Sequence, residues 1–337
     1  MPSSPARGRR EYTPLMTALL PILAVTVPFF ALVLAGYVAG WRHVLPESAI
    51  PGLNAFVLYF ALPCLLFRFG LNTPIAEALN PVVLALYLGC ALLMVLVTIA
   101  FSLDDVVGLK DASFGALVTA FPNTGFMGVP LLAALFGPAI VGPMIATILI
   151  DMFVTSSLCI ALAQAGGASG GARAAAVRSL RGALSNPMPW AIALGGTLGA
   201  LGWRPAGPVD AVVRMLADAA TPVALFTIGA VLWRAGQHAH TRTARKRYVP
   251  QALAKLLLHP LLVFALALAA RSLGAPLTDL QITAITLTAA LPSAANVAML
   301  AERFGADNGR IARIILTSTM LSFVTFTWLA WAFGAGR

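Results

Sequence analysis

Charged residues are scarce in this sequence: Asp, Glu, Lys and Arg make up 10% of the 337 residues, whereas 59% are hydrophobic. Soluble domains carry roughly a quarter charged residues, so this composition and a mean hydropathy of +0.88 exclude a soluble globule. The apolar runs are long enough to cross a bilayer as helices, for which about 20 residues suffice. They lack the short alternating pattern of outer-membrane barrel strands. We therefore expect an all-α polytopic membrane protein.

Cysteine and enzyme motifs are also scarce. Cys64, Cys90 and Cys159 lie inside apolar runs at unrelated spacings, which indicates neither a disulfide nor a metal site. The segment 167–170 matches the Gly-x-Ser-Gly pattern of intramembrane serine proteases, but it falls in a Gly/Ala-rich stretch where such matches arise by chance. Neither a Walker loop nor a His-Glu-x-x-His motif is present. We expect no enzymatic activity, no cofactor and no resident metal.

Acidic residues are few, 12 against 22 basic ones, and the net charge is +10. The basic residues lie in short connections such as 242–247, which is typical of topology signals rather than of nucleic-acid binding. The connections after the fifth and seventh apolar runs should therefore be cytoplasmic, with both termini outside. The basic cluster at 7–10 disagrees with this orientation unless translation starts at Met16 rather than Met1. The run 15–41 is too long for a signal peptide and is expected to be the first span.

The apolar runs predict about ten spans in two halves. We place them at 17–40, 49–67, 80–102, 112–136, 140–165, 185–203, 210–233, 249–270, 279–301 and 311–334. A linker at 166–184 separates a five-helix repeat at 1–165 from a second at 185–337. Three landmarks recur in the same order in both halves: Pro63 with Pro222, Pro122 with Pro292, and Phe136-Gly137 with Phe304-Gly305. Because five is odd, the second repeat must be inverted relative to the first.

Two proline-interrupted stretches, at 121–130 and 291–296, lie inside the fourth and ninth runs. Broken helix is tolerated at membrane depth only where it is buried in protein or lines a wet cavity, and a matched pair of breaks points to a transporter's binding site. We take the crossover prolines to be Pro122, Pro130 and Pro292. We expect the substrate to contact Asn123, Thr124, Gly125, Ser293 and Asn296. The alternative is that the prolines kink the helices for packing and the asparagines only cap free carbonyls.

Asp151 is a carboxylate inside the fifth run, where charge is costly and usually functional. Thr147 and Thr155 share its helical face, and Ser318, Ser322 and Thr325 form a comparable stripe on the tenth run. Such a carboxylate could hold a sodium ion or exchange a proton. The alternative is a water-facing or paired carboxylate near the end of the span.

Lys255 and His259 lie four residues apart on the eighth run, just before Pro260. They could form a cationic face for an organic anion or take part in proton coupling. The alternative is that Lys255 snorkels to the cytoplasmic surface. Elsewhere, Arg214 and Asp218 are spaced as a local ion pair, and Arg303 lies near a helix end, where we expect it at the membrane interface.

The sequence resembles the auxin efflux carrier family along nearly its whole length. The marks are 56–63, the break 122–130, the break 292–296, and Lys255 followed by His259-Pro260. The resemblance implies ten spans in two inverted repeats, with spans four and nine unwound at their prolines and crossing near the midplane. It also implies a scaffold of spans one, two, six and seven, which could carry a homodimer face, and a transport domain that moves in an elevator-like manner. The Gly36-x-x-x-Gly40 pattern in span one is a packing signal on that scaffold.

Bacterial members of that family are associated with dicarboxylates such as malonate, and plant members with auxin, so the common element is an organic anion. The short central connection resembles the bacterial type. We therefore expect a secondary carrier of a small carboxylate in the bacterial inner membrane, coupled to Na⁺, H⁺ or the membrane potential. Two other classes stay open. A sodium/proton exchanger would usually carry acidic residues at the crossing, and a non-transporting membrane sensor would usually append a soluble domain.

Overall fold

A computed structural model describes residues 14–74, 79–165, 177, 181–182, 184–237 and 243–335. In these ranges the chain is helical, with a single isolated β-bridge and no extended strand. Seven helices there are long and apolar enough to cross a membrane. The prediction of a helical membrane protein is therefore confirmed. Most of the expected linker 166–184, the basic cluster 7–10 and Arg242 fall outside the described residues.

Helices overlap each of the ten predicted runs, but only seven of the runs hold a described helix that is long and apolar enough to cross a membrane. The first half holds α1 (Pro14–Trp41), η1 (Glu47–Ala49), α2 (Ile50–Phe56), η2 (Val57–Ala61), α3 (Leu62–Asn72), α5 (Pro81–Ser102), α6 (Leu109–Ala120), η3 (Thr124–Gly128), α7 (Val129–Phe136), η4 (Pro138–Ile140), α8 (Val141–Ile150), η5 (Asp151–Thr155) and α9 (Ser156–Gln164). The second half holds α11 (Pro187–Ala200), α12 (Gly207–Gln237), η6 (Arg245–Arg247), α13 (Val249–Leu253), η7 (Ala254–Leu258), α14 (His259–Ser272), α15 (Asp279–Ala289), α16 (Asn296–Arg303) and α17 (Asn308–Ala332).

Three predicted spans do not form one long helix. The fourth is divided into α6 and α7, the ninth into α15 and α16, and the sixth is the 14-residue α11. The second, fifth and eighth are continuous but contain the π-helical turns η2, η5 and η7. Such wide turns inside α-helices are frequent at functional sites.

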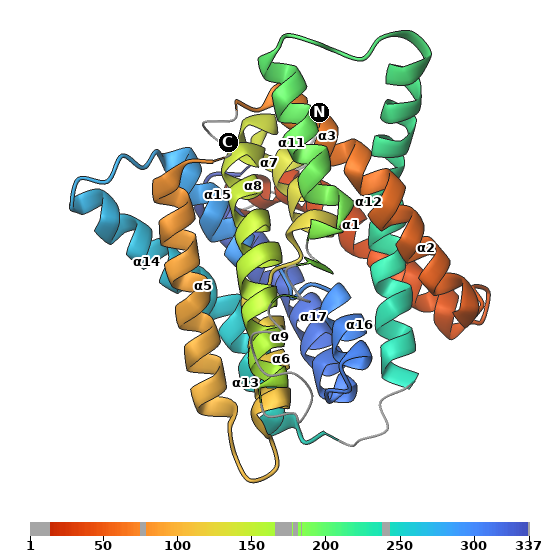
Figure 1. Cartoon of the computed structure of the whole chain (residues 1–337), viewed down its shortest axis with the longest axis vertical. Coiled ribbons are helices and arrows are strands. Elements are labelled where there is room, and N and C mark those ends of the chain that lie inside the picture. Colours follow the sequence, from red (N-terminus) through yellow and green to blue (C-terminus); the bar gives the residue numbers. More distant parts are fainter. Residues whose placement is uncertain are drawn as a thin grey trace, which may run out of the picture.

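The helices form two groups (Figure 1). In one, α1 packs along α12 and α3 along α11. In the other, α5 packs on α6, α8 and α14, and α15 packs on α14 and α8. Figure 1 shows α1, α2 and α12 together on the right and α5 and α14 together on the left. The groups meet where α17 contacts α1 and α12 and where η3 contacts α12.

Glycine allows the close approach of α1 to α12. A Cβ atom built on Gly36 would lie 1.8 Å from the carbonyl oxygen of Phe226, and one on Gly229 would lie 1.9 Å from that of Val33. A Cβ on Gly40 would lie 2.6 Å from the ring of Trp233. Small residues let helix backbones approach in this way within membranes. The Gly36-x-x-x-Gly40 pattern is therefore used for packing inside the chain.

Polar contacts tie the connections together at two opposite ends of the bundle. At one end Arg234 pairs with Glu47 at 3.1 Å and Arg247 with Asp104 at 3.5 Å, which joins the connections after the first, third and seventh predicted spans. At the other end Arg68 pairs with Asp218 at 3.3 Å. The expected pair of Arg214 with Asp218 is wrong, because Arg214 bonds to Asp210 one turn before it. Asp218 instead bridges α12 to α3.

Candidate functional site

The two broken helices meet directly. An antiparallel bridge joins Pro122 to Ser293. The Asn123 N–H donates to the carbonyl of Pro292 at 2.8 Å, and the Ala294 N–H donates to the carbonyl of Phe121 at 3.0 Å. Each break therefore satisfies backbone groups of the other, which is the condition for non-helical chain at membrane depth.

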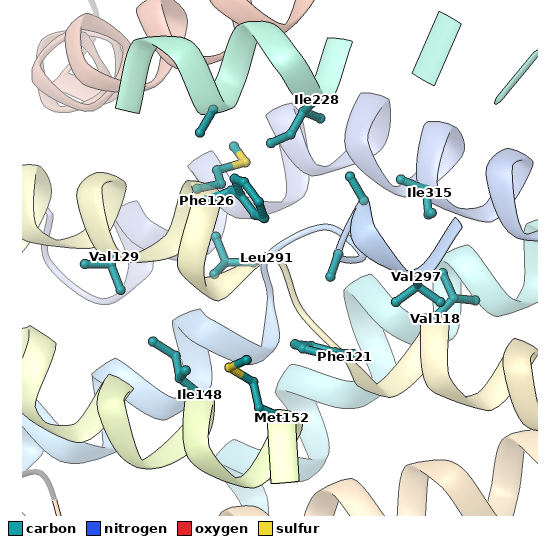
Figure 2. Packing of buried hydrophobic residues seen from close by; sticks show 14 of the residues in the cluster. Val118, Phe121, Phe126, Val129, Ile148, Met152, Ile228, Leu291, Val297 and Ile315 are labelled. Atoms are coloured by element: carbon teal, nitrogen blue, oxygen red, sulfur yellow. The ribbon is translucent and has the colours of Figure 1, made fainter. Parts of the chain in front are cut away.

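The crossing lies in the largest apolar cluster of the part of the chain that the structure describes. Figure 2 shows Phe121, Phe126, Leu291 and Met152 around the point where the two segments pass each other. A Cβ atom on Gly128 would lie 2.3 Å from Cδ1 of Leu291, so a glycine is needed there for the two broken helices to approach. Gly128 therefore permits the close packing of Leu291 against the first broken helix.

Pro130 has a different place from the other two prolines. It lies at the start of α7, directly after the π-helical turn η3. The N–H groups of Met127 and Gly128 both bond to the carbonyl of Asn123, at 3.1 and 3.0 Å, so helical winding has already restarted before Pro130. Pro130 therefore lies inside the restarted helix, while Pro122 and Pro292 lie at the crossing itself.

The polar side chains beside the breaks are buried, and their oxygen atoms form few hydrogen bonds. Asn123 is 3% exposed, Thr124 2% and Ser293 0%. Asn123 Oδ1, Thr124 Oγ1, Ser293 Oγ and Asn296 Oδ1 have no hydrogen-bond partner in the described part of the chain. Buried polar atoms are normally paired. The hydroxyls of Thr124 and Ser293 therefore cap no carbonyl, and all four oxygens are open to a ligand or to water.

A cavity of about 490 Å³ reaches the crossing. Asn296, Phe121 and Phe126 contribute from the broken helices, Met152 and Ser156 from the fifth span, and the remaining walls come from α2, η2, the start of α11 and the end of α16. The cavity thus lies between the two helix groups. Asn123, Thr124, Gly125 and Ser293 are not among its lining residues.

Arg303 also lines this cavity, at the end of α16. Arg303 is exposed, so its expected place at the membrane interface is compatible with a position at the cavity wall. The spacing could have indicated the cavity, because Arg303 follows Asn296 by seven residues, or about two helical turns.

A second group of polar side chains lies behind the crossing. Asp151, Lys255 and His259 are all 0% exposed. Asp151 accepts hydrogen bonds from the Tyr87 hydroxyl at 3.0 Å and from Thr155 at 3.2 Å. It also interacts electrostatically with Lys255. The alternative of a water-facing Asp151 is therefore wrong, and Tyr87 is a partner that nothing in the apolar pattern of α5 could have indicated.

Lys255 does not snorkel to the surface. Its Nζ donates to the carbonyl of Ala289 at 2.8 Å and lies 3.1 Å from Nδ1 of His259. In an unbroken helix that carbonyl would accept from the N–H of Ser293, but this N–H donates to Oγ of Ser318 at 3.2 Å. Lys255 therefore caps a carbonyl that the break in the ninth span has freed. Ser318 of the predicted stripe is tied to the same break.

The chain is similar in sequence to known membrane transport proteins. The sequence pattern of the family described as "Membrane transport protein" matches residues 21–330. The chain belongs to the auxin efflux carrier family of membrane transporters. It is 28% identical to the "Putative malonate transporter" of Rhizobium meliloti (strain 1021), covering 94% of this chain and 97% of that protein.

Two further relatives also have names that describe transport proteins. The "Uncharacterized transporter YfdV" of Escherichia coli (strain K12) is 25% identical over 88% of this chain and 93% of its own length. The "Auxin efflux carrier component 4" of Arabidopsis thaliana is 31% identical over 44% of this chain and 24% of its own length. The resemblance noted in the sequence is confirmed, and the chain is a membrane transporter of this family.

Proposed function

We propose that the protein is a secondary carrier of a small organic anion in the inner membrane of a bacterium, and that it works by an elevator-type alternating-access mechanism. The observation that carries this proposal is the cavity of about 490 Å³ between the two helix groups, which reaches the paired breaks at Asn296. Unpartnered oxygens and restarting helices surround the crossing. Restarting helix ends favour negatively charged groups.

The packing supports two inverted five-helix repeats. In the first half α1 precedes α3, and in the second half α11 precedes α12. Contacts join α1 to α12 and α3 to α11, so exchanging the halves reproduces the same pair of contacts. A pseudo-two-fold axis between inverted repeats has this effect. The helices α7 and α16 also end alike, at Gly137 with φ 85° and Gly305 with φ 64°.

The group of α1, α2, α3, α11 and α12 would be the scaffold, which could also carry a homodimer contact. The group with both crossing segments would move against it. The cavity is lined by Ser185 and Asn186 near the basic connection that we assign to the cytoplasm. In this arrangement the substrate site opens inward, and sliding of the mobile group would carry it to the other side.

Coupling would use Asp151, Lys255 and His259. The Lys255 ammonium is bonded to the carbonyl of Ala289, which removes a ligand that a sodium ion beside the break would need. This favours a proton or the membrane potential over sodium as the driving force. Lys255 would also balance the buried charge of Asp151.

A sodium/proton exchanger is the second candidate, and the buried carboxylate of Asp151 favours it. Against it, the crossing carries Asn, Thr and Ser side chains rather than carboxylates. The two candidates differ in what they move: an exchanger would carry ions in liposomes that contain no organic anion.

The test is uptake of radiolabelled malonate into proteoliposomes, with pH, sodium and potential gradients imposed separately. We expect saturable uptake driven by the pH or potential gradient. Asn123→Ala and Asn296→Ala should each reduce uptake about 10- to 100-fold, the loss for a hydrogen bond to a charged ligand. Asn72→Ala, at the opposite end of the bundle, is the matched control and should transport normally. Normal uptake by both crossing variants would refute the site, and ion exchange without malonate uptake would favour the exchanger.

A further inference from the structure

Arg303 is the one charged side chain among the described residues that line the large cavity. The other polar groups there are neutral: Asn54, Tyr59, Ser156, Ser185, Asn186 and Asn296. Within the described part of the chain no carboxylate lies within 4 Å of Arg303 to neutralise it. The cavity therefore has a positive character that comes from one side chain.

The same face of α16 carries the cavity wall from the crossing to Arg303. Asn296, Met299, Leu300 and Arg303 all line the cavity, and their spacing of three, four and seven residues puts them on one side of a helix. At 1.5 Å per residue the two polar ends, Asn296 and Arg303, are about 10 Å apart along the axis. Met299 and Leu300 form an apolar stretch between them.

The neighbouring arginines are engaged elsewhere, but Arg303 is directed by an aromatic ring. Its guanidinium lies over the ring of Phe304, 6.0 Å from the centroid, and Phe304 is also a cavity residue. By contrast, Arg234 pairs with Glu47, and Nε of Arg310 donates to the carbonyl of Arg247. A guanidinium held by a ring still presents its donors in a planar fork, which matches a carboxylate in bidentate geometry.

We propose that Arg303 is the anion-recognition residue of this cavity, and that it binds the carboxylate of a substrate whose second polar group faces Asn296. This assignment rests on the proposed carrier function. The substrate's carboxylate faces Arg303, its carbon chain contacts Met299 and Leu300, and its other polar end reaches Asn296. Dicarboxylates and hydroxycarboxylates fit this order, whereas a monocarboxylate without a second polar group leaves Asn296 unused.

The experiment compares wild type, Arg303→Gln and Arg303→Lys in proteoliposomes, with radiolabelled malonate and its monomethyl ester as substrates. Arg303→Gln removes the charged hydrogen bonds and should raise the KM for malonate about 10-fold or more, with Vmax little changed. Arg303→Lys keeps the charge without the fork and should recover part of the loss. The preference of the wild type for malonate over the monoester should disappear in Arg303→Gln.

Arg245→Gln is the matched control, because Arg245 is an exposed arginine that does not line the cavity. It should leave KM unchanged, which separates recognition in the cavity from general surface charge. The thermal stability of ligand-free Arg303→Gln should equal that of wild type, since Arg303 is exposed and without an ion pair among the described residues.

The outcomes are distinguishable. If wild type takes up malonate and Arg303→Gln has an unchanged KM, the Arg303 assignment is wrong while the carrier function stands. If Arg303→Gln lowers Vmax alone, the residue acts in movement rather than in recognition, and the assignment is also wrong. A further outcome is that the wild-type protein takes up neither malonate nor its monoester and gains no thermal stability from either. In that case the proposed carboxylate function is wrong, and the role of Arg303 is wrong with it.

Discussion

Replacing Lys255 by methionine should destabilise the protein strongly. Nζ of Lys255 is bonded to the carbonyl of Ala289 at 2.8 Å and lies 3.1 Å from Nδ1 of His259, and both Lys255 and Asp151 are 0% exposed. The substitution leaves the freed carbonyl of Ala289 without a donor, and it removes the electrostatic interaction of Lys255 with Asp151, with which Lys255 forms no direct ion pair in the described part of the chain. Leaving a buried hydrogen-bond acceptor unsatisfied costs about 1–3 kcal/mol.

That free energy converts to a measurable change in melting temperature. An unfolding entropy of about 2.1 cal/mol/K per residue gives roughly 0.7 kcal/mol/K for this chain. Each kcal/mol therefore shifts Tm by about 1.4 °C, and Lys255→Met should lower Tm by about 1.5–4 °C. Fluorescence-detected unfolding in one detergent at pH 7 measures this, with the exposed Lys110→Met as control.

A double-mutant cycle tests the electrostatic part of the reasoning. Asp151→Asn removes the buried charge but can still accept from Tyr87, so it should restore stability in the Lys255→Met background. We expect the double variant to be more stable than the sum of the two single changes by about 1–3 kcal/mol, or roughly 1.5–4 °C in Tm. Additive losses would contradict the electrostatic interaction between Lys255 and Asp151. A Lys255→Met protein within about 1 °C of wild type would contradict the capping of the Ala289 carbonyl by Lys255.

Two further predictions concern packing and pH. Gly36→Ala should lower the free energy of unfolding by about 1–3 kcal/mol, measured by thermal unfolding, because its Cβ would lie 1.8 Å from a backbone oxygen of α12; Gly89→Ala, with open space around it, should be neutral or stabilising. The backbone N–H groups of Val107 and Val106, and then Arg247, hold the pKa of Asp104 below its ordinary value. The stabilisation that Asp104 contributes is therefore present above the ordinary pKa of an aspartate and is lost as pH falls through the lowered pKa. The Tm difference between wild type and Asp104→Ala should shrink towards zero in acid. A Tm difference that does not change with pH would contradict this reasoning.

The sequence located the two breaks but not the way in which they are satisfied. Pro122 and Pro292 identify the breaks because proline lacks an N–H and disrupts helical winding. The hydrogen bonds that replace the lost ones are backbone to backbone, from Asn123 to Pro292 and from Ala294 to Phe121. Such bonds use no side chain and leave no pattern in the sequence. The sequence therefore left a capping role of the asparagines open as an alternative, whereas these backbone bonds are what joins the two breaks.

The sequence also could not predict which charged side chains point into the protein and which point to its surface. A helix that is apolar on all sides has no periodicity to tell which face is buried, so Lys255 could equally snorkel or turn inward. The π-helical turns η5 and η7, at Asp151 and around Lys255, shift the register further. For Arg303, the seven-residue spacing from Asn296 is visible in the sequence. The cavity that both residues line is formed by five separate parts of the chain, so it could not be predicted from that spacing.

The reciprocal bonds between the breaks set a condition on how the protein is made. Asn123 leaves the ribosome about 170 residues before the carbonyl of Pro292, its partner, is synthesised. At about 5–20 residues per second, this is a delay of roughly 10–30 s. During that time the fourth span has amide and carbonyl groups without partners, which lipid cannot satisfy. Until the second half arrives, the N–H of Asn123 and the carbonyl of Phe121 depend on water or on other protein groups for hydrogen bonds, so the first half reaches its native bonding only after the ninth span is made.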